Sequence, residues 1–114
     1  MSGLYINDYQ LKAFEFAIFE NQLYPFLALS EEVGEVNAVV AKALRKGRTP
    51  EGLTVAERVK LEGELGDAFW QLCACCTVLG VRLDDIAEAN IVKLTNRRAV
   101  GEIGYGATEE RRNG

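Results

Sequence analysis

The chain has 114 residues, of which 48% are hydrophobic and 26% are charged; it has no histidine, and its 13 basic and 17 acidic residues give a net charge of −4. This length predicts a single domain, and the missing histidine excludes Ser-His-Asp and Cys-His nucleophiles, imidazole zinc sites and di-iron bundles built on Glu-x-x-His pairs. The acidic balance argues against a surface for nucleic acid or an anionic membrane, but it permits a polyphosphate held through bound cations.

The first predicted helix covers residues 7–22 and is apolar around most of its circumference. Its narrow polar stripe consists of Asp8, Lys12, Glu15 and Gln22. A helix this apolar is usually covered on two sides, and in so small a protein the second cover is expected to be another subunit. The helix therefore predicts self-association.

Two further helices are predicted on either side of a turn-rich loop. Pro25 suits the first turn of the second helix, which ends near Lys46 with Gly47 as its C-terminal cap. After the loop at residues 47–53, Thr54 and Glu57 predict a capping box that opens the third helix. That helix runs to Gly80, and its apolar stripe includes Leu61, Leu65, Leu72 and Leu79.

Three cysteines, Cys73, Cys75 and Cys76, lie close together on the third helix. An odd number of cysteines at such short spacing makes a poor disulfide framework and indicates a reducing compartment. A zinc site on Cys73 and Cys76 would need a second pair of ligands, which the sequence does not offer. We therefore interpret the cysteines as small, buried apolar side chains.

The fourth predicted helix begins near Asp84 and Asp85, whose charges suit a helix N-terminus, and runs to about Arg98. No pattern of period two predicts a strand, so we expect an all-α, bundle-like subunit of four to five helices. Residues 1–100 are assigned to one helical domain and residues 101–114 to a Gly-rich flexible tail. The sequence shows no membrane span or signal peptide, and we expect a cytoplasmic protein.

Two short acidic patterns carry the chemistry, Glu-Glu-Val-Gly-Glu at residues 31–35 and Glu-Leu-Gly-Asp at residues 64–67. Residues three apart share a helix face, so each pattern directs a carboxylate pair to one side. If the two helices pack antiparallel, four acids converge: Glu32, Glu35, Glu64 and Asp67. Their repulsion would be relieved by a divalent cation that prefers oxygen ligands, Mg²⁺ or Mn²⁺.

Three glycines, Gly34, Gly63 and Gly66, lie beside these acids inside the predicted helices. Each costs about 1 kcal/mol of helix stability relative to alanine. They make sense there if the backbones approach closely or if a ligand needs the space. The alternative interpretation of the acids is an ordinary solvated helix face.

The fourth helix carries Asn90, Lys93 and Arg97 along one stripe. Lys93 is suited to phosphate oxygens as a point charge, and Arg97 as a two-pronged donor. The alternative is a pair of solvated cations that favour the helix dipole.

Taken together, Glu31-Glu32-x-x-Glu35, Glu64-x-x-Asp67, Asn90-x-x-Lys93-x-x-x-Arg97 and the Gly-rich end resemble the MazG-like, all-α nucleoside triphosphate pyrophosphohydrolases. The resemblance implies hydrolysis of a nucleoside triphosphate to the monophosphate and pyrophosphate, and assembly as a dimer or tetramer. It also implies Mg²⁺ bound by Glu32, Glu35, Glu64 and Asp67. The chain is similar to the short, single-domain form, which phage-encoded members also have; a phage protein would work in the host cytoplasm.

The resemblance also implies roles for the neighbouring residues. Glu31 would either support the metal-binding residues from behind or help to position the attacking water, and Glu35 or Glu32 would accept the water proton. Lys93 and Arg97 would hold the phosphates, and Asn90 would contact sugar or phosphate. In relatives the base pocket is lined by the first helix and by aromatic residues, so the candidates here are Phe14, Ile18, Asn21 and Trp70. For each of these four, the alternative is packing in the core.

The leading substrate is dGTP or GTP. Guanine presents a donor edge that Asn, Gln or Glu can accept, and the first helix offers Glu15, Glu20, Asn21 and Gln22. The chain also resembles a short phage branch of the family that cleaves dGTP. Two alternatives stay open: a related pyrophosphohydrolase that acts on dUTP or phosphoribosyl-ATP, and a non-catalytic helical protein that binds metal and oligomerises through its first helix.

Overall fold

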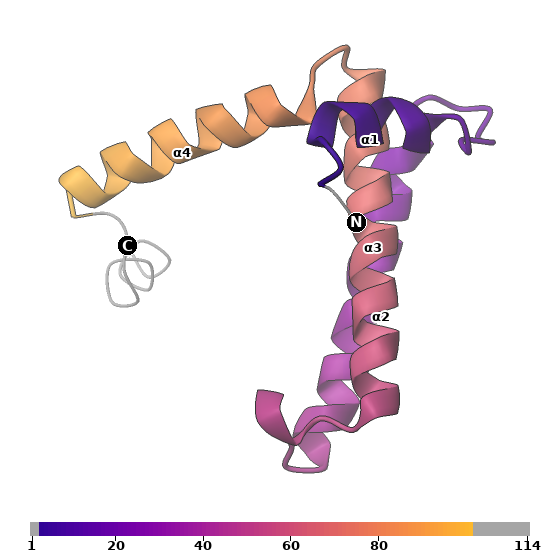
Figure 1. Ribbon diagram of the computed structural model, residues 1–114, viewed down its shortest axis with the longest axis vertical. Coiled ribbons are helices and arrows are strands. Elements are labelled where there is room, and N and C mark those ends of the chain that lie inside the picture. Colours follow the sequence, from indigo (N-terminus) through magenta and orange to yellow (C-terminus); the bar gives the residue numbers. More distant parts are fainter. Residues whose placement is uncertain (1–2, 102–114) are drawn as a thin grey trace.

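The computed structural model describes residues 3–101, which form four α-helices and one short 3-10 helix (Figure 1). The α-helices are α1 (Ile6–Phe14), α2 (Tyr24–Arg45), α3 (Val55–Val78) and α4 (Leu83–Ala99), and the 3-10 helix is η1 (Pro50–Gly52). Figure 1 shows α2 and α3 side by side as an antiparallel hairpin, with α1 packed near one end and α4 extending away. The prediction of an all-α fold is confirmed.

The ends of α2 follow the sequence signals. Pro25 lies in the first turn, where its missing N–H costs nothing. At the other end Gly47 has a φ of 71°, a left-handed conformation that glycine adopts without strain. This turn lets the Arg48 backbone N–H donate to the Ala43 carbonyl at 3.0 Å, which closes the helix. The predicted cap at Gly47 is confirmed.

The start of α3 is held by the predicted capping box. The Glu57 backbone N–H donates to Thr54 Oγ1 at 3.1 Å, and the Thr54 backbone N–H donates to Glu57 Oε1 at 2.8 Å. Glu57 also pairs with Arg48, Nε to Oε1 at 3.2 Å. These contacts, led by the Thr54 backbone hydrogen bond, hold the pKa of Glu57 below its usual value. The carboxylate thus ties the loop after α2 to the first turn of α3.

The first helix is shorter than predicted, because α1 ends at Phe14 rather than near residue 22. Residues 15–23 form turns and irregular structure instead. The stretch after Phe14 is rich in aromatic and β-branched side chains, which favour helices weakly. Phe14 and Phe19 meet edge to face with their ring centroids 5.9 Å apart, and Asn21 Oδ1 accepts a hydrogen bond from the Leu23 backbone N–H at 2.9 Å. These contacts favour the turn over helix continuation.

The core lies where α1, α3 and the start of α4 meet. Cys73, Cys76 and Leu83 are buried there, with Tyr9 and Phe69 packed against them. All three cysteines are buried and free, as predicted. Burial, together with the neighbouring Cys76, raises the pKa of the Cys73 thiol to about 11, so this side chain stays neutral near pH 7.

Much apolar surface stays uncovered within one chain. The Cα radius of gyration is 17.1 Å, whereas a compact chain of this length has about 13 Å. Leu65, Leu72 and Leu79, which we expected in the buried stripe of α3, are 52%, 36% and 64% exposed. They face outward because α4 does not fold back over the hairpin. This surface is what a self-associating chain presents, and self-association stays a prediction.

Candidate functional site

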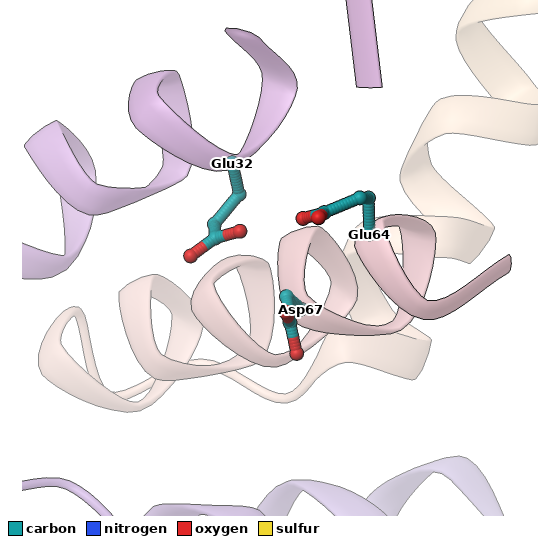
Figure 2. Close-up of side chains that lie close together, drawn as sticks. All are labelled: Glu32, Glu64 and Asp67. Atoms are coloured by element: carbon teal, nitrogen blue, oxygen red, sulfur yellow. The ribbon is translucent and has the colours of Figure 1, made fainter. Parts of the chain in front are cut away.

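Three of the predicted acids meet between the two long helices. Carboxylate oxygens of Glu32, Glu64 and Asp67 all lie within 4.8 Å of one another. Glu32 comes from α2, whereas Glu64 and Asp67 lie one turn apart on α3 (Figure 2). Glu32 and Glu64 are half-buried and Asp67 is exposed. The antiparallel hairpin therefore turns two acidic patterns far apart in the sequence into one cluster.

The cluster carries concentrated negative charge. Burial, and then the charges of Asp67, Glu64, Glu35 and Glu31, raise the pKa of Glu32. Within residues 3–101, no lysine or arginine forms an ion pair with Glu32, Glu64 or Asp67. Carboxylates at this separation, without a cationic side chain between them, suit a hard divalent cation with oxygen ligands.

The other two acids of the first pattern, Glu31 and Glu35, are exposed on α2 and lie outside this group of three. Glu35 still raises the pKa of Glu32, so it lies near enough to act on that carboxyl. Its side chain lines a neighbouring pocket between α2 and α3. The structure thus brings together three of the four acids that we expected to converge.

The three helical glycines face open space. A Cβ atom added at Gly34, Gly63 or Gly66 would meet no other atom within 4 Å. The interpretation that these glycines allow the two backbones to approach closely is therefore wrong. The second interpretation, space for a ligand beside the acids, is compatible with this geometry.

The basic stripe of α4 lies apart from the acids. Asn90 and Lys93 are exposed and Arg97 is half-buried, all on the helix that extends away from the α2–α3 hairpin. Within one chain, the structure does not bring Lys93 and Arg97 to the acidic cluster.

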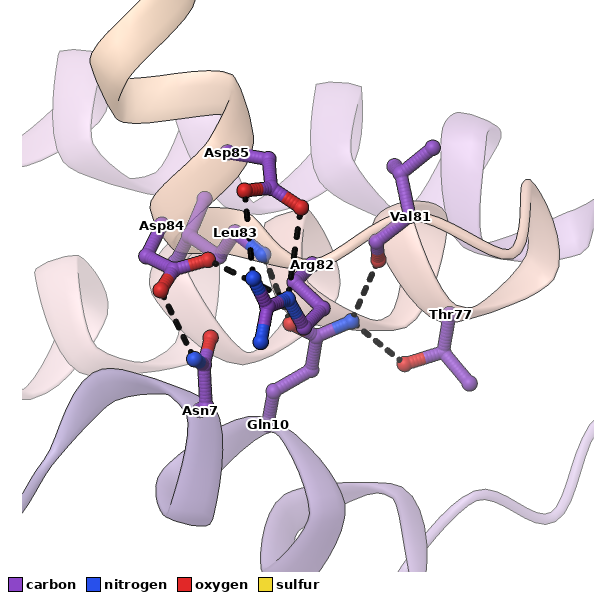
Figure 3. A network of polar contacts seen from close by, with 8 residues as sticks. All are labelled: Asn7, Gln10, Thr77, Val81, Arg82, Leu83, Asp84 and Asp85. Atoms are coloured by element: carbon purple, nitrogen blue, oxygen red, sulfur yellow. Dashed lines mark hydrogen bonds and ion pairs between the residues drawn. The ribbon is translucent and has the colours of Figure 1, made fainter.

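A polar junction sets the direction of α4 (Figure 3). The buried Gln10 side chain donates to Thr77 Oγ1 at 3.1 Å and to the Val81 carbonyl at 2.9 Å, and accepts from the Leu83 backbone N–H at 2.7 Å. The last bond caps the first residue of α4. Beside it, Asn7 Nδ2 donates to Asp84 Oδ2 at 2.8 Å. The sequence patterns did not predict this junction.

A cavity of about 430 Å³ lies between the segment that joins α1 to α2 and the C-terminal third of α3. Three of the predicted base-contacting residues line it: Ile18, Asn21 and Trp70. Trp70 Nε1 donates to the Ala13 carbonyl at 3.0 Å, which fixes the indole ring. Phe14, the fourth candidate, lines a different cavity.

A second cavity, of about 520 Å³, also borders Trp70 and reaches Asp67. Its walls include Tyr9, Lys12 and Phe16. We did not predict these residues as site residues. Tyr9 and Phe16 belong to the broad apolar surface predicted for the first helix and Lys12 to its polar stripe, and neither pattern separates a cavity wall from a subunit contact.

Comparison with known proteins identifies the family. The model of the MazG nucleotide pyrophosphohydrolase domain matches residues 21–100, so the chain belongs to this family. Family members are hydrolases that act on acid anhydrides and typically use a divalent metal. The match contains α2, α3 and α4, and therefore the acidic cluster and the basic stripe, but not α1.

The chain is also similar to the Gene 37 protein of Mycobacterium phage L5. The two are 30% identical over 110 residues, which cover 88% of this chain and 94% of the phage protein. No solved structure matches the chain. Within residues 3–101, no helix combines the length and the apolarity needed to cross a bilayer.

Proposed function

We propose that the protein hydrolyses a nucleoside triphosphate, with dGTP or GTP as the leading substrate, to the monophosphate and pyrophosphate in a Mg²⁺-dependent reaction. The observation that carries this proposal is the group of three carboxylates between α2 and α3. Family membership supports nucleotide pyrophosphohydrolysis in general. Mn²⁺ is expected to substitute for Mg²⁺, because both ions accept carboxylate oxygens.

Glu32, Glu64 and Asp67 would hold the cation through their carboxylate oxygens. When bound, the cation supplies positive charge beside the phosphate oxygens and makes water a better nucleophile. The water oxygen then bonds to the α-phosphorus while the bond from this phosphorus to the bridging oxygen breaks, which releases pyrophosphate. We assign the water proton to Glu35, with Glu31 orienting the water, because both lie within one helical turn of Glu32 on α2 and their charges act on its carboxyl group.

The guanine base is assigned to the cavity lined by Ile18, Asn21 and Trp70. Its remaining lining residues include Glu20, an exposed carboxylate, and Gln71, an amide. Carboxylate and amide oxygens accept hydrogen bonds from the N–H groups of guanine, and the indole offers a flat apolar face for stacking. Trp70 lies one helical turn after Asp67, which places this cavity next to the acids along α3.

Lys93 and Arg97 would hold phosphate oxygens, and Asn90 would contact the sugar or phosphate, from a second copy of the chain. The direction of α4 away from its own hairpin supports this assignment, as does the uncovered apolar surface. A dimer or tetramer would then be the active form. The expected partners are the nucleotide and other copies of the chain, and we expect neither a nucleic acid nor a membrane as a partner.

A turnover screen tests the proposal. The protein is incubated with each of the eight common ribo- and deoxynucleoside triphosphates, with and without Mg²⁺, and pyrophosphate and monophosphate are measured. We expect both products in equal amounts, with dGTP or GTP preferred and no turnover without a divalent cation. Two added reactions contain dUTP and phosphoribosyl-ATP, and turnover of only one of these two compounds would assign the protein to a related class of pyrophosphohydrolase. Mg²⁺-dependent stabilisation without any turnover would favour the non-catalytic alternative.

The sole tryptophan of the chain, Trp70, provides a direct test of the base pocket. We expect dGMP to change its fluorescence, because a stacked base alters the surroundings of the indole ring. Inorganic tripolyphosphate, which has no base, is expected to leave the signal unchanged. Equal responses to both compounds would place the base elsewhere. The measurement needs no turnover, so it remains informative if the protein proves inactive.

A further inference from the structure

The pocket that Glu35 lines between α2 and α3 lies toward the loop end of the hairpin, and it has a volume of about 220 Å³. Three lysines line it: Lys42 on α2, Lys46 directly after the end of α2, and Lys60 on α3. Glu35 borders the same pocket, which therefore adjoins the acidic cluster. The sequence patterns did not predict these lysines as site residues.

The lysines of this pocket outnumber its two carboxylates, Glu35 and Glu57. Its other acid, Glu57, is engaged by Arg48 and by the Thr54 backbone. In the part of the chain that the structure describes, no carboxylate forms an ion pair with any of the three lysines. The dipole of α2 favours cations at its C-terminal end and so accounts for Lys42 and Lys46. It does not account for Lys60, which lies near the start of α3.

The base cavity, the acids and the lysines follow one another along the hairpin. On α3, Lys60 lies one turn before Glu64, about 6 Å along the axis at a rise of 1.5 Å per residue. Further along the same helix come Asp67 and then Trp70. The antiparallel α2 repeats this order, from Tyr24 at the base cavity through Glu32 to Lys42. Both helices therefore present an aromatic cavity, then acids, then lysines.

A nucleoside triphosphate has the matching order of base, α-phosphate and distal phosphates. We propose that Lys42, Lys46 and Lys60 bind the pyrophosphate end of the nucleotide, on the side of the acidic cluster opposite the base. This inference rests on the proposed function. It assigns the β- and γ-phosphates to side chains of the same chain that supplies the acids, and lysine suits phosphate oxygens as a mobile point charge. The same charges would favour the departing pyrophosphate as its negative charge grows.

Binding of inorganic pyrophosphate with Mg²⁺, measured by calorimetry, tests the pocket apart from turnover. The test variant combines Lys42→Gln with Lys60→Gln. The control combines Arg45→Gln with Arg58→Gln, which removes one exposed cation from each of the same two helices and lies outside the pocket. We expect the lysine variant to bind pyrophosphate at least about tenfold more weakly, and the control less than about twofold. Binding of dGMP is expected to stay unchanged in both.

The outcomes separate this inference from the proposed function. Equal pyrophosphate affinity in the native protein and the lysine variant would overturn the pocket assignment, even if the native protein turns over dGTP. Selective loss of pyrophosphate binding supports the assignment, and a native protein that then shows no turnover would instead overturn the proposed function. Lys42→Arg with Lys60→Arg keeps the charge and is expected to retain binding. Thermal unfolding of all variants checks for a general loss of structure. We expect unchanged unfolding temperatures, because these lysines are not buried.

Discussion

Replacing Asp67 by asparagine is expected to abolish turnover while leaving the protein folded. The substitution removes one of three clustered carboxylates but keeps the size of the side chain. Loss of a ligand to a catalytic cation removes several kcal/mol of transition-state stabilisation, so kcat/KM should fall by about 10³-fold or more. Steady-state release of pyrophosphate measures this loss.

The same substitution is expected to lower activity without lowering the thermal stability of the metal-free protein. Without metal, Asp67 is the charge that contributes most to the raised pKa of Glu32 after burial. The neutral amide introduced by Asp67→Asn would lower that repulsion, so the metal-free variant should unfold at the same temperature as the native protein or a higher one. The stabilisation that Mg²⁺ gives the native protein should disappear.

The pH dependence follows from the direction of the Glu32 shift. A carboxyl group whose pKa is higher in the folded than in the unfolded state binds more protons when folded, so the contribution of Glu32 to the stability of the metal-free protein is lost as the pH rises from 4.5 through the raised pKa. In Asp67→Asn this loss should be smaller. Glu62→Gln is the control, because Glu62 is an exposed acid on α3 outside the cluster.

Full activity in Asp67→Asn would contradict the proposed role of Asp67 as a ligand of the cation.

Replacing Gln10 by alanine is expected to destabilise the protein by about 3 kcal/mol. Three hydrogen bonds are lost, and the buried backbone N–H of Leu83 loses its acceptor. Chemical denaturation measures the change in the free energy of unfolding. Hydrogen exchange at the Leu83 amide should accelerate further than at amides in the middle of α2, because the junction of α3 and α4 opens first.

Gln22→Ala is the matched control, since Gln22 is an exposed glutamine without a side-chain hydrogen bond in the part of the chain described by the structure. We expect it to change stability by less than about 0.5 kcal/mol. If Gln10→Ala costs no more than the control, water replaces the side chain at the junction, and Gln10 does not set the direction of α4.

Local signals in the sequence were sufficient to predict α2 and α3. Pro25, Gly47 and the pair of Thr54 and Glu57 act within one turn of the residues that they cap, so their effect does not depend on the rest of the fold. The spacing of the acids likewise fixes which face of each helix they share. It does not fix how far one helix slides along the other, which explains why three acids meet and Glu35 lies outside the group.

Features that depend on distant contacts were missed or wrong. The end of α1 depends on Phe19 and on the turn at Asn21, which the helical pattern of residues 7–22 did not reveal. The partners of Gln10 lie 67 to 73 residues away in the sequence. The outward direction of α4 follows from that junction. The sequence therefore predicted the basic stripe on α4, but it did not predict that this stripe lies apart from the acidic cluster of the same chain.

If the proposed site is shared between two chains, the outward direction of α4 makes the rate of the reaction depend on the protein concentration. If Lys93 and Arg97 serve a nucleotide, they serve one held by another copy, because their helix extends away from its own hairpin. The specific activity would then fall on dilution while each chain keeps its helices, as subunits separate by mass action. A cell, or an infecting phage, would obtain little hydrolysis from the first few chains made and a steep rise once enough chains had accumulated to assemble.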